Sequence, residues 1–398
     1  MKVAQRPTGR AGDAVPAAVE ISIVMPCLNE VETLATCIAK AREAIERGGY
    51  SAEIIVADNG SSDGSQLVAR ELGVRVVDIQ RKGYGSALIG GIEAAQGRFV
   101  VMGDADASYD FAAIAPLIAK LREGYDLVVG NRFLGGIEPG AMPWSHRWLG
   151  NPVLTRISRI FFHAPVGDTH CGLRAFTKDA YGRMRLHATG MEFASEMVIK
   201  ASLKGMRITE VPVVLHPDGR SRPPHLRTWR DGWRHLRFML LFSPRWLFLY
   251  PGLALLAGGL ILSALLVGGP LWIGGVRLDI HTLLVAGFLA LLGYQLVLFA
   301  VFTKMFAIRE GFHPPHPVLE TLLRYITLEV GLLAGALMAL GGLVALVVAV
   351  VSWQSVGFGR LNPSTTMREV IPAVVLLALG TQTIFASFFI SILAIERD

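Results

Sequence analysis

The chain has 398 residues, of which 52% are hydrophobic and 18% are charged, and its formal net charge is +6. Its mean hydropathy of +0.46 argues against an ordinary soluble enzyme, because such chains hold fewer apolar and more charged residues. Charged residues are frequent up to about Arg245 and become rare beyond it. We therefore expect a water-exposed N-terminal part followed by a membrane-embedded part.

The first segment, Met1–Val19, is basic but lacks an apolar core of the length that a signal peptide requires, so we expect residues 1–19 to form a flexible tail. Beyond it, short apolar strands alternate with helical or glycine-rich segments. The strands are expected at Ile21–Pro26, Ile54–Ala57, Val74–Val77 and Phe99–Met102. This alternation predicts an α/β domain with a mostly parallel, Rossmann-like sheet and right-handed crossovers.

A polar side chain follows each of these strands. In chain order these side chains are Asn29, Asp58, Lys82 and Asp104. Ligands of such sheets gather at the carboxyl ends of the strands. We therefore expect the four side chains to converge on one edge of the sheet.

The stretch Gly103–Asp110, reading GDADASYD, suggests a metal site. Asp104 and Asp106, two residues apart at the end of a strand, are expected to share a face, because successive side chains of a strand alternate. Their oxygen ligands suit Mg²⁺ or Mn²⁺, which would carry a diphosphate, with Asp106 as the more direct ligand. Asp110 is expected to cap the next helix. A polar turn after a buried strand is the alternative interpretation.

Four long runs without Asp, Glu, Lys or Arg occupy the second part of the chain, and each supplies the ~20 residues that a membrane-spanning helix needs. They are Phe248–Gly275, His281–Thr303, Val330–Gly359 and Val370–Ile395. We predict four transmembrane helices. Glycines such as Gly335 permit close helix contacts, within the chain or in a homo-oligomer.

Basic residues cluster before the first run and in the loop around Arg309, whereas the loop around Arg277 is nearly free of them. By the positive-inside rule, the N-terminal domain and both termini would be cytoplasmic. The sequence thus predicts a multi-pass protein of the cytoplasmic (inner) membrane.

Residues 220–245 link the two parts and are rich in arginine and tryptophan. Trp229, Trp233 and Leu236 can share one helical face, while the arginines fall mainly elsewhere, which is typical of an interfacial helix. The expected domains are therefore residues 20–219, the basic juxtamembrane segment 220–245, and a helical membrane domain over residues 246–398.

The motifs MPCLNE, VADNGSSDGS, RKGYGSALIGGIEAAQG and GDADASYD, in this order, resemble the family-two glycosyltransferases of GT-A fold. The motifs DTHCGLRAF, EVPV and GRSR, followed by membrane helices, are similar to the polyisoprenyl-phosphate glycosyltransferases, which include dolichol-phosphate mannose synthase-like and bactoprenol glucosyltransferase-like enzymes. This resemblance covers Ile21 to about Arg237. It implies an α/β GT-A domain that binds a nucleotide sugar and a polyprenyl phosphate.

The resemblance also implies a set of donor-binding residues. They are Pro26, Asn29, Glu30 and Asp58 around the base and ribose, Lys82 and Asp104 at the diphosphate, Arg132 at the donor, and Glu192 at the sugar hydroxyls. Alternatives remain for most of them: strand-end punctuation for the first four, a loop lysine for Lys82, a surface arginine for Arg132, and a solvated face for Glu192. Asn59 departs from the second acid that is common in the family, which leaves the base preference open.

For catalysis the resemblance places Asp168 and Arg174 beside the sugar and the acceptor, with Asp168 as the catalytic carboxylate. A structural ion pair is the alternative. Arg220, Ser221 and Arg222 match the loop that holds the acceptor phosphate, and an anchor for anionic lipid headgroups is the alternative.

A lipid phosphate needs no strong general base, because its second pKa is about 6 and it is already largely a dianion at neutral pH. The favoured hypothesis is inverting transfer of a hexose, from a uridine-linked donor, to a polyprenyl phosphate such as undecaprenyl phosphate, for envelope glycan or glycoconjugate synthesis. One alternative is a processive polysaccharide synthase, although its Gln-x-x-Arg-Trp signature is absent from the chain. Another is a catalytically silent scaffold that binds nucleotide sugar.

Overall fold

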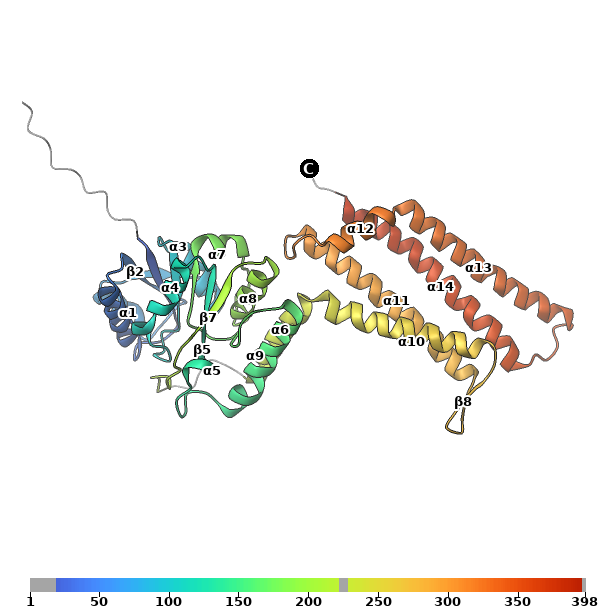
Figure 1. Ribbon diagram of the computed structural model, residues 1–398, viewed down its shortest axis with the longest axis horizontal. Helices are drawn as coiled ribbons and strands as arrows, with labels where there is room; N and C mark the ends of the chain where they lie inside the picture. Colours follow the sequence, from blue (N-terminus) through green and yellow to red (C-terminus); the bar gives the residue numbers. More distant parts are fainter. Residues whose placement is uncertain (1–18, 222–227, 396–398) are drawn as a thin grey trace, which may run out of the picture. The chain divides into compact units, whose positions relative to one another are not determined.

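The computed structural model describes residues 19–221 and 228–395. Within it the chain forms two compact units, Met1–Phe238 and Met239–Asp398, which we describe separately. Figure 1 shows an α/β unit, followed along the chain by a helical unit. The expected tail over residues 1–19 lies almost entirely outside the described residues.

The first unit is built on a seven-stranded sheet with the order β3-β2-β1-β4-β6-β5-β7. Its strands are β1 (Ile21–Cys27), β2 (Ala52–Asp58), β3 (Arg75–Asp78), β4 (Phe99–Met102), β5 (Leu127–Asn131), β6 (Arg174–Thr177) and β7 (Ile208–Pro212). β6 runs antiparallel to both β4 and β5, and the other pairings are parallel. The predicted mostly parallel α/β fold is therefore confirmed.

The helices of this unit are α1 (Leu34–Gly48), α2 (Ser65–Glu71), α3 (Tyr84–Ala94), α4 (Ala115–Arg122), α5 (Arg132–Gly135), α6 (Asn151–Phe162), α7 (Lys178–Met184), α8 (Phe193–Leu203) and α9 (Thr228–Leu241), with short turns η1 (Phe111–Ala113) and η2 (His146–Gly150). Of these, α1 and α3 pack against β2, and α4 and α7 pack against β6. Every residue of β1 and β4 is buried, which is why these strands read as continuous apolar runs rather than alternating ones.

The helix α1 shows how the sequence pattern produces the packing. Its buried residues Leu34, Cys37, Ile38 and Ala41 recur at intervals of three and four, so they line one face against the sheet. The helix ends at Gly49, whose φ of 60° is a left-handed conformation that glycine adopts without strain. The apolar pattern of α1 thus determines which face of the helix packs on the sheet.

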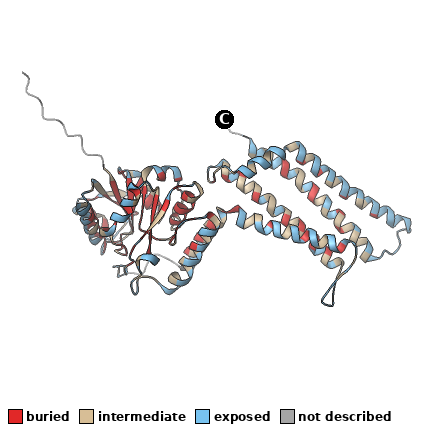
Figure 2. Ribbon diagram, viewed as in Figure 1, coloured by how far each residue is buried: buried red, intermediate tan, exposed pale blue. Residues whose placement is uncertain are grey.

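The second unit contains four long helices, α10 (Tyr250–Val267), α11 (Ile280–Arg309), α13 (Leu328–Ser355) and α14 (Pro363–Ala394). By length and composition these four helices of the described chain can cross a membrane, the first together with the π-helical turn η3 (Arg245–Leu249). Most of their side chains are exposed or intermediate (Figure 2), as expected of surfaces that face lipid. The four predicted spans are thus confirmed as helices.

The first apolar run, Phe248–Gly275, contains the predicted spanning helix but is not helical to its end. The helix stops at Val267, and a two-stranded hairpin of β8 (Leu271–Ile273) and β9 (Val276–Leu278) follows. Gly274 and Gly275 form its turn with φ values of 55° and 81°, which other residues rarely adopt. A short helix, α12 (Pro317–Tyr325), lies between α11 and α13.

Small residues allow α10 and α11 to pack closely. A Cβ added at Gly259 would lie 2.5 Å from the backbone nitrogen of Ala290 and 2.6 Å from the carbonyl oxygen of Ala286. Gly335 and Gly380 meet in the same way between α13 and α14. These glycines therefore serve helix contacts inside the chain.

We expect Gly259→Leu to lower the stability of the full-length protein by about 2 kcal/mol, because the larger side chain forces the helices apart. The matched control is Gly258→Leu, since nothing lies within 4 Å of a Cβ at that neighbouring position. Thermal unfolding in detergent measures both. Equal loss in the two variants would contradict the packing described.

Candidate active site

The predicted convergence of strand ends is present at the carboxyl edge of the first sheet. The segments after β1 and β2 are joined there, because Ser61 Oγ accepts a hydrogen bond from Asn29 N at 2.8 Å. The segments after β1 and β4 are joined as well, through the hydroxyl of Thr33, which donates to the carbonyl oxygen of Ala105 at 2.7 Å. One continuous site thus spans several strand ends.

Asp58, at the end of β2, is held by its own loop and is only 1% exposed. Its Oδ2 accepts hydrogen bonds from Gly60 N, Ser61 N and Gln66 Nε2 at 2.9, 3.0 and 2.6 Å. Burial alone would raise its pKa, but these hydrogen bonds outweigh burial and hold the pKa below its ordinary value. Its other oxygen, Oδ1, is buried and has no partner among the described residues, so it is available to a ligand.

Asn59, which follows Asp58, holds the neighbouring loop by hydrogen bonds. Its amide nitrogen donates to the carbonyl oxygens of Ile79 and Arg81 at 3.1 and 2.9 Å, and its oxygen accepts from Gly83 N at 2.7 Å. An aspartate could not make the two donated bonds. The same loop carries Lys82, whose Nζ donates to the carbonyl oxygen of Asn59 at 2.7 Å.

Asp104 and Asp106 lie in a turn beyond the strand, because β4 already ends at Met102. The argument from strand alternation was therefore wrong, although the two carboxylates are electrostatic neighbours. Desolvation, and then the charge of Asp106, raise the pKa of Asp104 to about 7. The hydroxyl of Tyr84, on α3, donates to Asp104 Oδ1 at 2.8 Å. Asp110 caps η1, as expected of a helix cap.

Arg220 neutralises part of this acidic cluster. Its guanidinium lies 2.6 Å from Asp106, 3.1 Å from Glu30 and 3.1 Å from Asp218. Ser221 next to it donates to Glu32 from both its backbone nitrogen and its hydroxyl. The segment predicted to bind the acceptor phosphate is thus held against the metal candidates. Arg222, the third residue of that prediction, lies outside the described residues.

The donor set of Asp104 and Asp106 fits a hard divalent cation. Asp104 is desolvated beside a second carboxylate, an arrangement that a cation would stabilise. No cluster of three or more His, Cys, Asp or Glu side chains is arranged for a metal within the ranges that the structure describes. Mg²⁺ commonly keeps several waters and takes phosphate oxygens in addition to one or two carboxylates, so two acids are sufficient.

Arg132 is only 8% exposed, which excludes the alternative of a surface arginine. Its Nε and Nη2 donate to the two oxygens of Asp168 at 2.7 and 2.8 Å, and its backbone nitrogen donates at 3.1 Å. Asp168 itself is fully buried. This forked pair links the end of β5 to the DTHCGLRAF motif.

Arg174 is also fully buried, but it contacts main chain rather than Asp168. Its three nitrogens donate to the carbonyl oxygens of Cys171, Ala194 and Thr169 at 2.8, 2.6 and 2.6 Å. These bonds hold the guanidinium against the main chain of the motif and of α8.

Glu196, one helical turn beyond Glu192, is 2% exposed and pairs with Lys200 at 2.7 Å. Glu192 Oε2 is buried without a partner among the described residues, so it remains available to a ligand. Pro26 is buried within β1, where it pairs in register with Ala57.

One cluster that the sequence interpretation missed joins α9 to α8. The hydroxyl of Ser195 lies 2.8 Å from His235 Nδ1 and 3.2 Å from His170 Nε2, and the two imidazole rings meet edge to face. Burial lowers the pKa of His235 to about 4, and it holds the pKa of His170 well below its ordinary value. His170 within DTHCGLRAF was the available signal, but its partners lie far away in the sequence.

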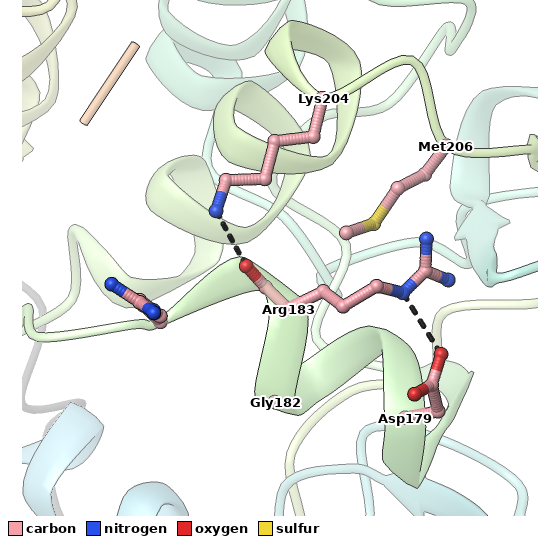
Figure 3. A pocket seen from close by; sticks show the side chains of 6 residues that line it. Asp179, Gly182, Arg183, Lys204 and Met206 are labelled. Carbon is pink, nitrogen blue, oxygen red and sulfur yellow. Dashed lines mark hydrogen bonds and ion pairs between the residues drawn. The ribbon is translucent and has the colours of Figure 1, made fainter. Parts of the chain in front are cut away.

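A surface hollow elsewhere in the unit is unrelated to these residues (Figure 3). Arg183 there donates to Asp179 at 2.8 Å, and Lys204 donates to the carbonyl oxygen of Arg183 at 2.6 Å. The hollow lies at the start of α7, directly after Thr177, which pairs with the first residue of β4. It therefore belongs to the amino ends of the parallel strands, the opposite edge from Asp104.

We expect the wild-type protein to lose stability as the pH falls from about 6.5 toward 4. Over this range His235 binds a proton in the unfolded chain but not in the folded one. The free energy of unfolding therefore falls by up to about 1.4 kcal/mol for each pH unit. His235→Asn should flatten this dependence, whereas His163→Asn, at an exposed left-handed position that asparagine tolerates, should not. Urea unfolding at pH 6.5 and 5.0 measures the difference, and identical slopes for all three proteins would contradict this role.

Comparison with known proteins agrees with the geometry. Residues 22–184 match the model of glycosyl transferase family 2, and residues 301–394 match that of the glycosyltransferase family 2 C-terminal transmembrane region. A low-salt glycan biosynthesis hexosyltransferase of Haloferax volcanii is 37% identical over 373 residues, which cover 93% of this chain and 88% of the relative. A dolichyl-phosphate hexose transferase of the same organism is 30% identical over 195 residues, covering 49% of this chain and 82% of the relative.

Among solved structures, glucosyl-3-phosphoglycerate synthase of Mycobacterium tuberculosis, in complex with Mn²⁺, uridine diphosphate and glucosyl-3-phosphoglycerate, is 23% identical, with 60% of this chain and 84% of that chain covered and a TM-score of 0.44. We base no argument on a likeness of that size. The family models and the nearly full-length relative are sufficient without it. The chain belongs to glycosyltransferase family 2 and carries the C-terminal transmembrane region of that family.

Proposed function

We propose that this glycosyltransferase moves a hexose from a nucleoside-diphosphate sugar to a polyprenyl phosphate, with inversion at the anomeric carbon. The observation that carries the proposal is the locked state of Asp168, which is fully buried and accepts three hydrogen bonds from Arg132. A carboxylate so occupied is poorly placed to take a proton from a hydroxyl acceptor. A phosphate acceptor is already largely ionised at neutral pH and requires no such base.

Asp168 is then a positioning residue for Arg132 rather than a base. The forked pair holds the guanidinium in one orientation at the end of β5, where it can meet negative charge on the donor. Arg174 acts indirectly, because it holds the backbone of the motif that contains Asp168. Such prior orientation is what makes electrostatic stabilisation effective during transfer.

The donor would lie along the carboxyl edge of the sheet. The unpartnered Oδ1 of Asp58 is available to the base or ribose, and the ammonium of Lys82 can turn from Asn59 toward the diphosphate. Asn29, Glu30 and Pro26 line the neighbouring strand end, and Glu192 would meet sugar hydroxyls. The base is proposed as uracil.

Asp104 and Asp106 would hold Mg²⁺ or Mn²⁺, which supplies neutralisation of the charge that develops on the leaving diphosphate. The guanidinium of Arg220 lies 2.6 Å from Asp106, so in this proposal Arg220 moves away when the carboxylate of Asp106 binds the metal. We infer that Arg220 and Ser221 then turn to the acceptor phosphate, together with Arg222.

The names of the relatives support the substrate classes. One is a hexosyltransferase of glycan biosynthesis and another is a dolichyl-phosphate hexose transferase, which supports a hexose and a polyprenyl phosphate for this chain. The basic residues before the first span place the catalytic unit, in this proposal, on the cytoplasmic face of the membrane.

Membranes that contain the wild-type enzyme should form labelled lipid from nucleotide hexose and polyprenyl phosphate, and Asp104→Asn and Asp106→Asn should each lower the rate at least about a hundredfold. The matched control is Asp110→Asn, which removes an acid from the same turn that caps η1. Free polyprenol in place of the phosphate tests the acceptor. Undiminished product in both variants, or equal product from polyprenol, would overturn the proposal.

Arg220→Gln should tighten binding of Mn²⁺ in the presence of uridine diphosphate about tenfold, because a competing cation leaves Asp106 and Glu30. The same variant should slow transfer to the lipid. Electron paramagnetic resonance of free Mn²⁺ measures the binding, with Arg122→Gln, whose exposed partner is Glu20, as the control. Weaker binding in Arg220→Gln would show that this arginine does not compete with the metal.

A further inference from the structure

The start of α10, which follows η3, packs beside the end of α11. The two helices are antiparallel neighbours, because Gly259 packs on Ala290 and Gly252 packs on Leu296. The ring of Phe248, in η3, lies 6.1 Å from that of Phe299. Arg245 begins the turn η3 that contains Phe248, and it lies close enough for its charge to act on His313, the partner of Lys304.

His313 completes the group from the loop after α11. The ammonium of Lys304 donates to His313 Nδ1 at 3.0 Å, and the imidazole ring stacks on Phe242 with 6.3 Å between ring centres. His313 is only 7% exposed. Burial, and then the charges of Lys304 and Arg245, lower its pKa to about 4, so the imidazole is neutral at pH 7.

Two positive charges therefore lie close together. Neither Arg245 nor Lys304 forms an ion pair with a carboxylate in the described part of the chain, and the acceptor for the ammonium of Lys304 is a neutral imidazole. The apolar run that follows Arg245, Phe248–Gly275, and the run that precedes Lys304, His281–Thr303, contain no Asp, Glu, Lys or Arg. Unpaired cations near hydrocarbon are costly, so such an arrangement favours an anionic ligand.

The neighbouring aromatic side chains indicate the depth of this group in the membrane. Trp246 and Tyr250 are 38% and 44% exposed and pack edge to face with 4.9 Å between ring centres. Such residues concentrate at the level of the lipid headgroups. Arg245 begins the first span, and the long stem of Lys304, five residues before the end of the second, lets its ammonium reach the same level.

We propose that Arg245, Lys304 and His313 form a binding site for the phosphate group of a membrane lipid. The guanidinium of Arg245 supplies forked donors, the ammonium of Lys304 supplies a compact charge, and His313 fixes the direction of that ammonium. Two sources have this chemistry, a polyprenyl phosphate and an anionic phospholipid. The site stands on the membrane unit alone and is independent of the transfer reaction proposed above.

Native mass spectrometry of the full-length protein in detergent tests the site, by titration with undecaprenyl phosphate, phosphatidylglycerol, undecaprenol and inorganic phosphate in separate arms. We expect Arg245→Gln and Lys304→Gln to weaken binding of the lipid phosphate about tenfold each. Lys304→Arg should restore most of it. The matched control is Arg309→Gln, which removes an exposed cation from the end of the same helix.

Preference for undecaprenyl phosphate over phosphatidylglycerol would identify the first source, and equal binding would identify a general headgroup site. Unchanged binding in both glutamine variants, or an equal loss in Arg309→Gln, would overturn the proposal. So would equal binding of undecaprenol, or binding of inorganic phosphate alone. The melting temperature of each variant separates loss of binding from loss of folding, and Lys304→Arg remains informative if the glutamine variants unfold.

Discussion

Charge compensation at the carboxyl edge of the sheet is the constraint on which the rest of the catalytic unit depends. Glu30, Asp104 and Asp106 gather where β1 and β4 end, and the guanidinium of Arg220 pairs with two of them. Desolvation leaves Asp104 with a raised pKa, so the cluster accepts further positive charge readily. In the proposed function a divalent ion and Arg220 exchange places at this edge, which would couple donor binding to the segment that precedes α9.

Buried arginines give the rest of the site its rigidity. Arg132 is tied to Asp168, and Arg174 is tied to three carbonyl oxygens, so the loops between β5, β6 and α8 are held by charge-assisted hydrogen bonds rather than by apolar packing alone. Removing one member of the buried Arg132–Asp168 pair leaves the charge of the other uncompensated. A substitution at Asp168 is consequently a perturbation of folding as well as of activity, and kinetic measurements on it need a folding control.

The family, the parallel β-α units and the four membrane helices could all be predicted from local patterns, because apolar periodicity and strand-end motifs are contiguous in sequence. Partners could not be predicted in the same way. Asp168 was expected to act on substrate, yet it meets Arg132, 36 residues away, because β6 inserts antiparallel between β4 and β5. Asp104 and Asp106 were placed on a strand, whereas the chain turns after Met102. Such long-range pairings depend on topology that short motifs do not encode.

The amide of Asn59 has a consequence for engineering donor choice. Replacing it with aspartate would remove two donated hydrogen bonds and free the loop that carries Lys82, so in the proposed donor site a change of nucleotide preference would be confounded by lost positioning of that lysine. Gln66, which touches Asp58 from α2 without supporting that loop, is the better position to vary. Libraries that alter selectivity in this chain should leave residue 59 fixed and diversify the helix behind the acid.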